Sequence, residues 1–116
     1  MLTPDFDRYS LALFHEGRLV FISEKEGLRP LVECVLACRG HFSGCELHDR
    51  AIGLAAAKLV VASGGLITRI VTRRVSARAV TLLESASVPL AAGEVVPVLL
   101  NRDRTRPCLM EQKASA

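Results

Sequence analysis

Two short stretches near the start of the chain carry the hydrophobic patterns of paired strands. Residues 9–14 alternate between two faces, and residues 19–22 are apolar at every position. A strand that is apolar throughout is typical of the centre of a sheet. Gly17 lies in the polar turn between the two stretches, where a positive φ closes a hairpin without strain. The pattern predicts a β-hairpin with 19–22 as a central strand.

The next periodic stretch predicts a helix over residues 31–38. Pro30 suits the first turn of a helix, and Gly40 closes it. Cys34 and Cys38 lie one helical turn apart, a spacing that places two metal ligands side by side. Both cysteines share the apolar stripe of this helix, so we expect core packing rather than metal binding.

Residues 46–65 read as a polar loop that runs into a nearly all-apolar helix over 50–62. Lys58 is the only charged residue between 51 and 61, which predicts a helix buried on most sides. Asp49 is expected to be its N-cap. Gly53 inside a helix costs about 1 kcal/mol relative to alanine, so close approach of another backbone or of a ligand is expected there.

Shorter elements follow this helix. Residues 66–72 predict a strand, and 77–84 a helix capped by Ser76. Residues 88–90 predict a short strand near a sheet edge because of the proline, 91–94 a break, and 95–100 a further strand or extended segment. Strands that alternate with helices predict an α/β layered fold with one mixed sheet.

Composition narrows the class of protein. The chain of 116 residues is half hydrophobic but only 4% aromatic, so one domain with an aliphatic core is expected, about 9–111, followed by a polar tail, 112–116. A formal charge of +3 without a basic block argues against nucleic-acid binding. No signal peptide or membrane-spanning run is evident, so we expect no membrane contact, a cytoplasmic location and reduced cysteines.

The chemically notable residues of the central stretch are His48, Asp49 and Arg50, at the expected start of helix 50–62. A helix N-terminus offers unpaired N–H groups and a partial positive charge, which suit an anion or a metal ligand. A simple cap with a solvated arginine is the favoured interpretation, because motif matches this short are often accidental.

Several segments together resemble a family of small uncharacterised proteins that share the cytidine-deaminase-like fold. These segments are 27–30, 49–57, the glycine pair at 64–65, 101–103, Cys108 and 110–111. The resemblance covers about 9–111. It implies a three-layer α/β fold with an N-terminal hairpin, followed by alternating helices and strands in one mixed sheet.

The chain departs from the zinc deaminases of that fold at the catalytic positions. In those enzymes the buried helix opens with His-x-Glu or Cys-x-Glu, and the next helix opens with Pro-Cys-x-x-Cys. His48 stands at the ligand position, but Arg50 replaces the glutamate, and the helix opening near 74–78 has no cysteine. We therefore expect no zinc cofactor and no hydrolytic deamination, and His48 is at most a weak metal candidate.

The same resemblance places a substrate pocket at the N-terminus of the buried helix. The candidate ligand-binding residues are Arg29, Asp49, Arg50, Gly53, Asn101, Arg102, Asp103, Cys108 and Glu111, with 101–111 folding over that end of the helix. Arginines and helix N–H groups suit a phosphate, and carboxylates suit a ribose hydroxyl or a base amino group. A nucleotide or nucleotide-derived ligand is the leading hypothesis.

Two alternatives of other classes stay open. A thiol-dependent enzyme would use Cys108, activated by His48 or an arginine, with Asp49 or Glu111 as the orienting group. A structural or interaction module would form a homodimer through apolar strands such as 88–90 or 95–100. The sequence leaves open whether the protein is an enzyme.

Overall fold

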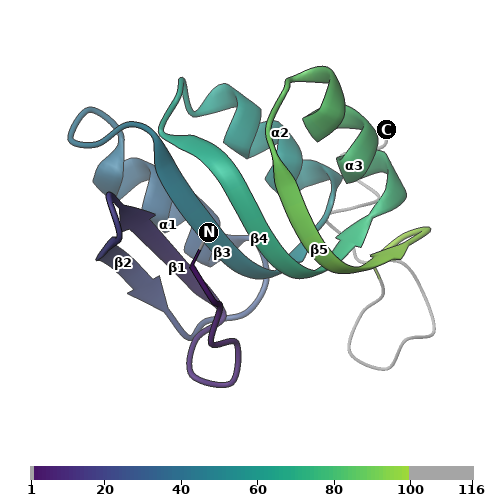
Figure 1. Cartoon of the computed structure of the whole chain (residues 1–116), viewed down its shortest axis with the longest axis horizontal. Coiled ribbons are helices and arrows are strands. Elements are labelled where there is room, and N and C mark those ends of the chain that lie inside the picture. The colour runs from purple at the N-terminus through teal and green to yellow at the C-terminus, as the bar shows by residue number, and fades with distance from the viewer. Residues whose placement is uncertain (1, 100–116) are drawn as a thin grey trace.

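A single mixed sheet of five strands organises the protein, in a computed structural model that describes residues 2–99. The strands are β1 (Leu11–His15), β2 (Arg18–Ser23), β3 (Cys45–Ile52), β4 (Ile67–Ser76) and β5 (Leu90–Val96). Their order across the sheet is β2-β1-β3-β4-β5. β1 is antiparallel to both of its neighbours, whereas β3, β4 and β5 run parallel (Figure 1).

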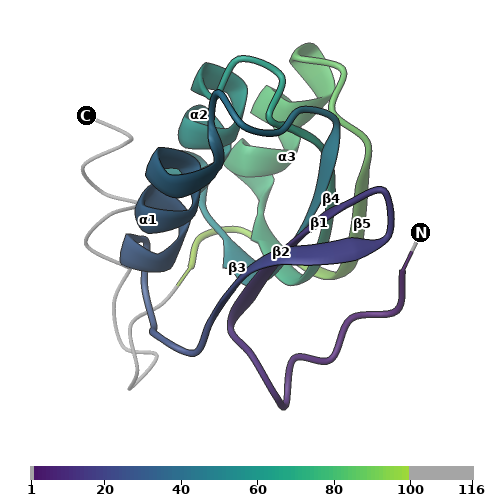
Figure 2. The same cartoon turned by 90° about the vertical axis from the view of Figure 1, so that its left-hand side faces the viewer.

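Three helices cover one face of this sheet, and the N-terminal segment lies against the other. The helices are α1 (Arg29–Cys38), α2 (Leu54–Ala62) and α3 (Ala77–Ser85), with α2 in contact with both others (Figure 2). On the opposite face, Phe6 and Tyr9 pack against Ala12 in a second, small hydrophobic cluster. Helices, sheet and N-terminal segment give a three-layer α/β arrangement.

The N-terminal hairpin is confirmed, but its second strand does not lie at the centre of the sheet. Glu16 (φ 51°) and Gly17 (φ 80°) form the two-residue turn, as the twist of a hairpin requires. β2 is an edge strand, and Leu19 and Ile22 are 49% and 45% exposed. β2 stays at the edge because the connection through α1 leads to β3, which pairs with the other side of β1.

The largest correction concerns residues 45–52, which form the central strand β3 rather than a loop and the start of a helix. Leu47 pairs with Leu13 of β1 and with Ile70 of β4, in the middle of the sheet. The predicted helix 50–62 therefore begins only at Leu54, and Gly53 is its N-cap in place of Asp49. Polar residues within β3 hid its two-residue period, because two of them, His48 and Asp49, are buried on opposite faces of the sheet.

The last two strands also differ from the prediction. The strand expected over 66–72 extends to Ser76, and residues 90–96 form one strand through the expected break at 91–94. Gly93 allows this continuity, since a Cβ atom there would lie 2.9 Å from the backbone oxygen of Arg73. Residues 95–100 therefore do not start a separate strand within the described part of the chain, and Val95 and Val96 close β5 instead.

The helical predictions for α1 and α3 are confirmed. Pro30 lies in the first turn of α1, and the Ser76 side chain caps α3 by accepting a hydrogen bond from the N–H of Ala79 at 3.3 Å. Both helices place their apolar stripe in one continuous core with α2 and the sheet. Cys34 and Cys38 lie in that core, as their spacing on the stripe predicted.

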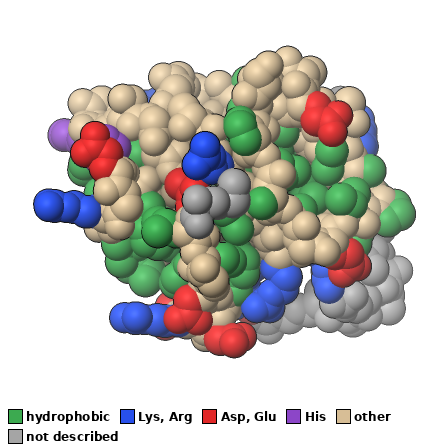
Figure 3. All heavy atoms as spheres, viewed as in Figure 1, with side chains coloured by type: hydrophobic (Ala, Val, Ile, Leu, Met, Phe, Trp, Pro, Cys, Tyr) green, Lys and Arg blue, Asp and Glu red, His purple; other side chains and the backbone are tan. Residues whose placement is uncertain are grey.

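The face of the sheet opposite the helices carries a mixed surface. Acidic and basic side chains lie among hydrophobic ones on the face that Figure 3 shows. Arg73 lies over the ring of Phe6, 5.5 Å from its centroid, and within 3.7 Å of Asp7. Among residues 2–99, no helix is long and apolar enough to cross a membrane.

Candidate functional site

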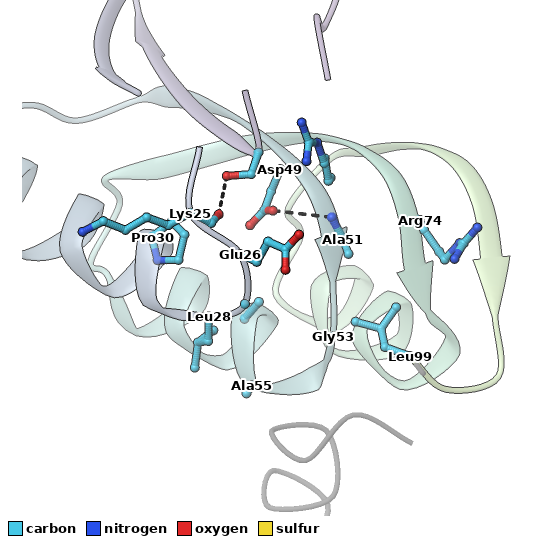
Figure 4. A pocket seen from close by; sticks show the side chains of 14 residues that line it. Lys25, Glu26, Leu28, Pro30, Asp49, Ala51, Gly53, Ala55, Arg74 and Leu99 are labelled. Carbon is cyan, nitrogen blue, oxygen red and sulfur yellow. Dashed lines mark hydrogen bonds between the residues drawn. The ribbon is translucent and has the colours of Figure 1, made fainter. Parts of the chain in front are cut away.

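A cavity of about 340 Å³ opens where the carboxyl ends of β2 and β3 meet the N-terminus of α2. The loop 24–28 forms one wall, the end of β3 and the first turn of α2 form the floor, and Arg74 and Leu99 lie at the far side (Figure 4). The carboxyl ends of parallel strands are the usual place for a ligand in α/β folds, because the loops there leave a crevice.

Asp49 provides the most unusual group in this cavity. Asp49 lies near the carboxyl end of β3 and lines the cavity, and only 8% of the residue is exposed. Desolvation raises the pKa of this carboxyl to about 7, although backbone hydrogen bonds from Ala51 and Arg50 oppose the change. The Ala51 N–H lies 3.4 Å from Oδ1. Asp49 is thus a buried acid that titrates near neutral pH and borders open space.

The N-terminus of α2 faces the same cavity without a side-chain cap. Gly53 is buried, has an extended conformation (φ −97°, ψ −176°), and has no side chain that could accept a hydrogen bond from the first turn. Ala55 and Ala56 of that turn line the cavity. Their methyl groups are small, and a helix N-terminus is a favourable neighbour for oxygen atoms that carry negative charge.

Hydrogen bonds fix the wall that the loop 24–28 forms. The Ser10 hydroxyl lies 2.5 Å from the backbone oxygen of Lys25 and 3.0 Å from that of Ser23. The Lys25 ammonium lies 3.1 Å from both carboxylate oxygens of Glu33. This anchoring holds Glu26 and Gly27 at the cavity, and the carboxylate of Glu26 reaches into it beside Asp49 (Figure 4).

Arg74 contributes a buried nitrogen on the opposite wall. Its Nε atom has no hydrogen-bond partner among the described residues and lies 3.6 Å from a carboxylate oxygen of Glu94. That distance is too long for a hydrogen bond but keeps the two charges together. The cavity therefore joins two carboxyl groups with a guanidinium and a helix N-terminus.

Comparisons with known proteins identify the family. A family model described as "TM1506: Domain of unknown function (DUF1893)" matches residues 6–116. The chain belongs to the DUF1893 family. No curated protein matches it. A crystal structure of a DUF1893 family protein (TM1506) from Thermotoga maritima is similar, with a TM-score of 0.84 and 25% sequence identity over 95% of this chain and 74% of that chain.

In this DUF1893 chain the residues singled out from the sequence are only partly brought together. Asp49, Arg50 and Gly53 are among the residues that line the cavity. The Arg50 guanidinium lies on the other face, where Nε donates to the Phe6 oxygen at 2.7 Å. Arg29 lies outside the cavity lining and pairs with Glu33 at 3.9 Å. The remaining candidates lie outside the described residues: Asn101, Arg102, Asp103, Cys108 and Glu111.

His48 lies within β3 and does not open a helix, which corrects its expected position at a metal-binding helix end. The ring is fully buried, with Nδ1 3.1 Å from the Tyr9 hydroxyl and Nε2 2.7 Å from Glu46 Oε2. The Asp5 N–H donates to the Tyr9 hydroxyl at 3.0 Å. A carboxylate only accepts hydrogen bonds, so Nε2 of His48 is the donor to Glu46. This chain of hydrogen bonds attaches the N-terminal segment to the sheet.

Glu46 ends this chain of hydrogen bonds and has a pKa below its usual range. Burial alone raises the pKa, but hydrogen bonds from His48 and from the Leu2 N–H outweigh that effect. The folded state therefore favours the ionised form. This stabilisation is present above the usual pKa of a glutamate and is lost as the pH falls through the lower value in the folded state.

Replacing Glu46 by glutamine is expected to lower the free energy of unfolding at pH 7 by about 1–2 kcal/mol, because hydrogen bonds to a charged acceptor are the stronger ones. The difference from the original protein should shrink as the pH falls below the usual pKa of a glutamate, because Glu46 is then increasingly protonated. Urea unfolding at pH 7 and pH 3.5 measures it. Glu33→Gln, at an exposed ion pair, should change stability by less than about 1 kcal/mol. An equal loss at both pH values would contradict the assignment.

The three cysteines among the described residues belong to the core. Cys34, Cys38 and Cys45 are buried and free, and burial raises the pKa of each thiol. Protonated thiols are poor nucleophiles and poor metal ligands. Within residues 2–99, no group of three or more His, Cys, Asp or Glu side chains is arranged to hold a metal ion.

Several residues of the cavity have no recognisable signal in the sequence. Lys25 and Glu26 occur in a polar stretch that looks like an ordinary loop, and Ser10 lies at the start of the alternating stretch 9–14. A charged loop directly after a hairpin becomes notable only when β3 is known to run beside β1, since that places the loop over the carboxyl end of β3. Arg74 is likewise explained only by the extra length of β4.

Proposed function

We propose that the cavity at the N-terminus of α2 binds a small polar molecule, a nucleoside or nucleotide-derived compound. The observation that carries the proposal is the buried carboxyl of Asp49 at the edge of open space. A buried acid without an opposite charge beside it costs stability when it ionises, and such groups concentrate at functional sites. A carboxyl group can bind the amino group of a base or a ribose hydroxyl.

The size and composition of the cavity support a ligand of this class. A volume of about 340 Å³ lies within the range of small-molecule pockets, about 300–1,000 Å³. Apolar side chains such as Leu28, Pro30 and Leu99 could cover the faces of a flat base. The polar groups sit at the two sides, with Asp49 and Glu26 opposite Arg74 and the end of α2.

The C-terminal candidates extend this proposal. Asn101, Arg102, Asp103, Cys108 and Glu111 follow Leu99, which itself lines the cavity. In our proposal this segment folds over the α2 N-terminus, with arginine for a phosphate and Glu111 for a hydroxyl. Glu111→Gln and Arg102→Ala would then weaken binding, and Cys108→Ser tests the thiol-dependent alternative. A Cys108→Ser protein that binds ligand normally would argue against a reacting thiol.

We propose a cytidine-deaminase-like fold without deaminase chemistry. A mixed sheet that starts with an antiparallel hairpin and continues with parallel strands supports this fold. The helix that follows the hairpin is α1, which opens with Arg29, Pro30 and Leu31, and α2 opens with Leu54, Ala55 and Ala56. Neither opening carries the His-x-Glu or Pro-Cys-x-x-Cys residues that zinc deamination needs, so we propose binding without that reaction.

Filling the cavity provides the direct test. Ala55→Leu is expected to abolish stabilisation by ligands while the protein stays folded, because Ala55 lines the cavity on the half-buried side of α2. Thermal-shift measurements with millimolar nucleosides, nucleotides and ADP-ribose measure the effect. The matched control, Ala62→Leu, lies at the exposed far end of the same helix and should bind as the original protein does. No stabilisation of the original protein by any of these compounds would refute the proposal.

We also predict that the protein forms a homodimer through the edge of its sheet. β5 lies at one edge of the sheet, and Val95 on it is 58% exposed. An edge strand presents unpaired backbone groups that a second sheet can use. Light scattering coupled to size exclusion should give twice the chain mass, and Val95→Lys should return the monomer. A monomer at micromolar concentration would exclude the prediction.

A further inference from the structure

Asp49 also gives the cavity a chemical preference, if the proposed function is right. We propose that Asp49 binds the ligand as a neutral carboxylic acid and selects a base edge with a ring-nitrogen acceptor beside an amino donor, as adenine and cytosine have. The acid O–H donates to the ring nitrogen, and its C=O oxygen accepts from the amino group.

The position of Asp49 supports the neutral form. Its neighbours across the sheet are Leu11 of β1 and Thr72 of β4, and neither carries a charge. The charged and titratable groups around it are Lys25 and Glu26 of the loop, Cys34 of α1 and Arg74 of β4.

None of these groups neutralises an Asp49 carboxylate. The Lys25 ammonium is held by Glu33, and the Arg74 Nε lies next to Glu94. Cys34 is buried and its pKa is raised, and Glu26 is a second carboxyl that offers no positive charge. Among residues 2–99, the ion pairs that form do not include Asp49. These surroundings favour the protonated form of Asp49, including when a ligand covers this side chain.

The two protonation states of Asp49 form hydrogen bonds with the edges of different nucleobases. A carboxylic acid offers one donor and one acceptor side by side, which matches the ring nitrogen and amino group of adenine and cytosine. A carboxylate offers only acceptors, which match the two adjacent N–H groups of guanine. The preference follows from the proton count of Asp49, so it should change with pH while the bases themselves stay neutral.

The pH dependence of binding tests the assignment. With a pKa of about 7, the neutral fraction of Asp49 falls roughly tenfold between pH 6 and pH 8, and the affinity for adenosine and cytidine should fall by the same factor. Guanosine should not weaken over this range. Isothermal titration with adenosine, cytidine and guanosine at pH 6 and pH 8 measures the three affinities on the full-length protein.

Two variants separate the roles of Asp49. Asp49→Asn keeps a donor beside an acceptor but cannot titrate, so it should bind adenosine with the same affinity at pH 6 and pH 8. Asp49→Ala removes both groups and should lose at least tenfold in adenosine affinity at pH 6, with circular dichroism and thermal unfolding confirming that it folds.

The outcomes distinguish this inference from the function on which it rests. Adenosine binding that weakens with pH in the original protein but not in Asp49→Asn supports the inference. Nucleoside binding that is independent of pH, or guanosine binding that weakens alongside adenosine, overturns it and leaves the binding site standing. Failure of all three nucleosides to bind the original protein at either pH overturns this inference, and the proposed function falls with it when nucleotides and ADP-ribose also fail to stabilise the protein.

Discussion

Replacing Asp49 by asparagine is expected to stabilise the protein above pH 7 by roughly 4 kcal/mol. The pKa of Asp49 rises from its ordinary 3.8 to about 7 on folding, a difference of about 3 units, and each unit corresponds to about 1.4 kcal/mol. Because the folded state holds the proton more tightly, the stability of the original protein falls as the pH rises from about 4 to about 7. Asparagine removes that loss because it does not ionise.

The gain from Asp49→Asn should itself depend on pH. Near pH 5 the advantage should shrink to about 1–2 kcal/mol, and below pH 4 it should vanish, because Asp49 is then neutral in both states. Urea unfolding at pH 4, 5 and 8 measures the free energies. Asp5→Asn, at an exposed carboxyl, serves as the control and should stay within about 0.5 kcal/mol of the original protein. Destabilisation by Asp49→Asn at every pH would show that the carboxylate is stabilised in the folded state.

The second large effect is expected at Leu47, in the middle of β3. This side chain is fully buried, faces the helices, and pairs across the sheet with Leu13 and Ile70. Leu47→Ala should lower the free energy of unfolding by about 2–5 kcal/mol, because it removes buried methyl groups and leaves a cavity. Urea denaturation at pH 6 gives the value.

Leu36→Ala provides a matched control for this measurement. Leu36 lies on α1 with 61% of the residue exposed, so its truncation should change stability by no more than about 0.5 kcal/mol. The comparison separates a central strand from the loop that the sequence suggested for residues 46–49. A cost at Leu47 as small as that at Leu36 would place this residue at the surface and contradict β3.

Elements with a strong local period could be predicted from the sequence. The hairpin and the helices α1 and α3 depend on alternation, on Pro30 at a helix start and on Ser76 as a cap, and each of these acts over a few residues. The core positions of Cys34 and Cys38 follow from the same stripe. Patterns that extend over only a few residues do not predict which strands pair in the sheet.

The errors occur where tertiary contacts override a local pattern. β3 places Glu46 and His48 on one face, where the N-terminal segment supplies Tyr9 and the Leu2 N–H as partners. On the other face it places Asp49 at a cavity. Polar residues with partners far away in the chain look like a loop when the sequence is read locally. The glycine at 93 likewise looked like a break, although a close approach of β4 requires it.

The candidate site shows the same division. Asp49 and Gly53 were identified from the sequence, but as the cap and interior of a helix rather than as the end of a strand and the true N-cap. Arg50 was assigned to the ligand, whereas β3 directs its guanidinium to the opposite face. In a strand neighbouring side chains point to opposite faces, so the change from helix to strand separates Asp49 from Arg50.

The sequence by itself determined an aliphatic α/β domain, its hairpin, two of its helices and the importance of residues 48–53. The tertiary structure alone decided that 45–52 is the central strand, that the loop after β2 closes over its carboxyl end, and that Asp49 is buried there. The physical reason is that strand pairing and desolvation depend on groups far apart in the chain. The raised pKa of Asp49 comes first from burial by residues far away in the chain, which outweighs the hydrogen bonds from its sequence neighbours Arg50 and Ala51.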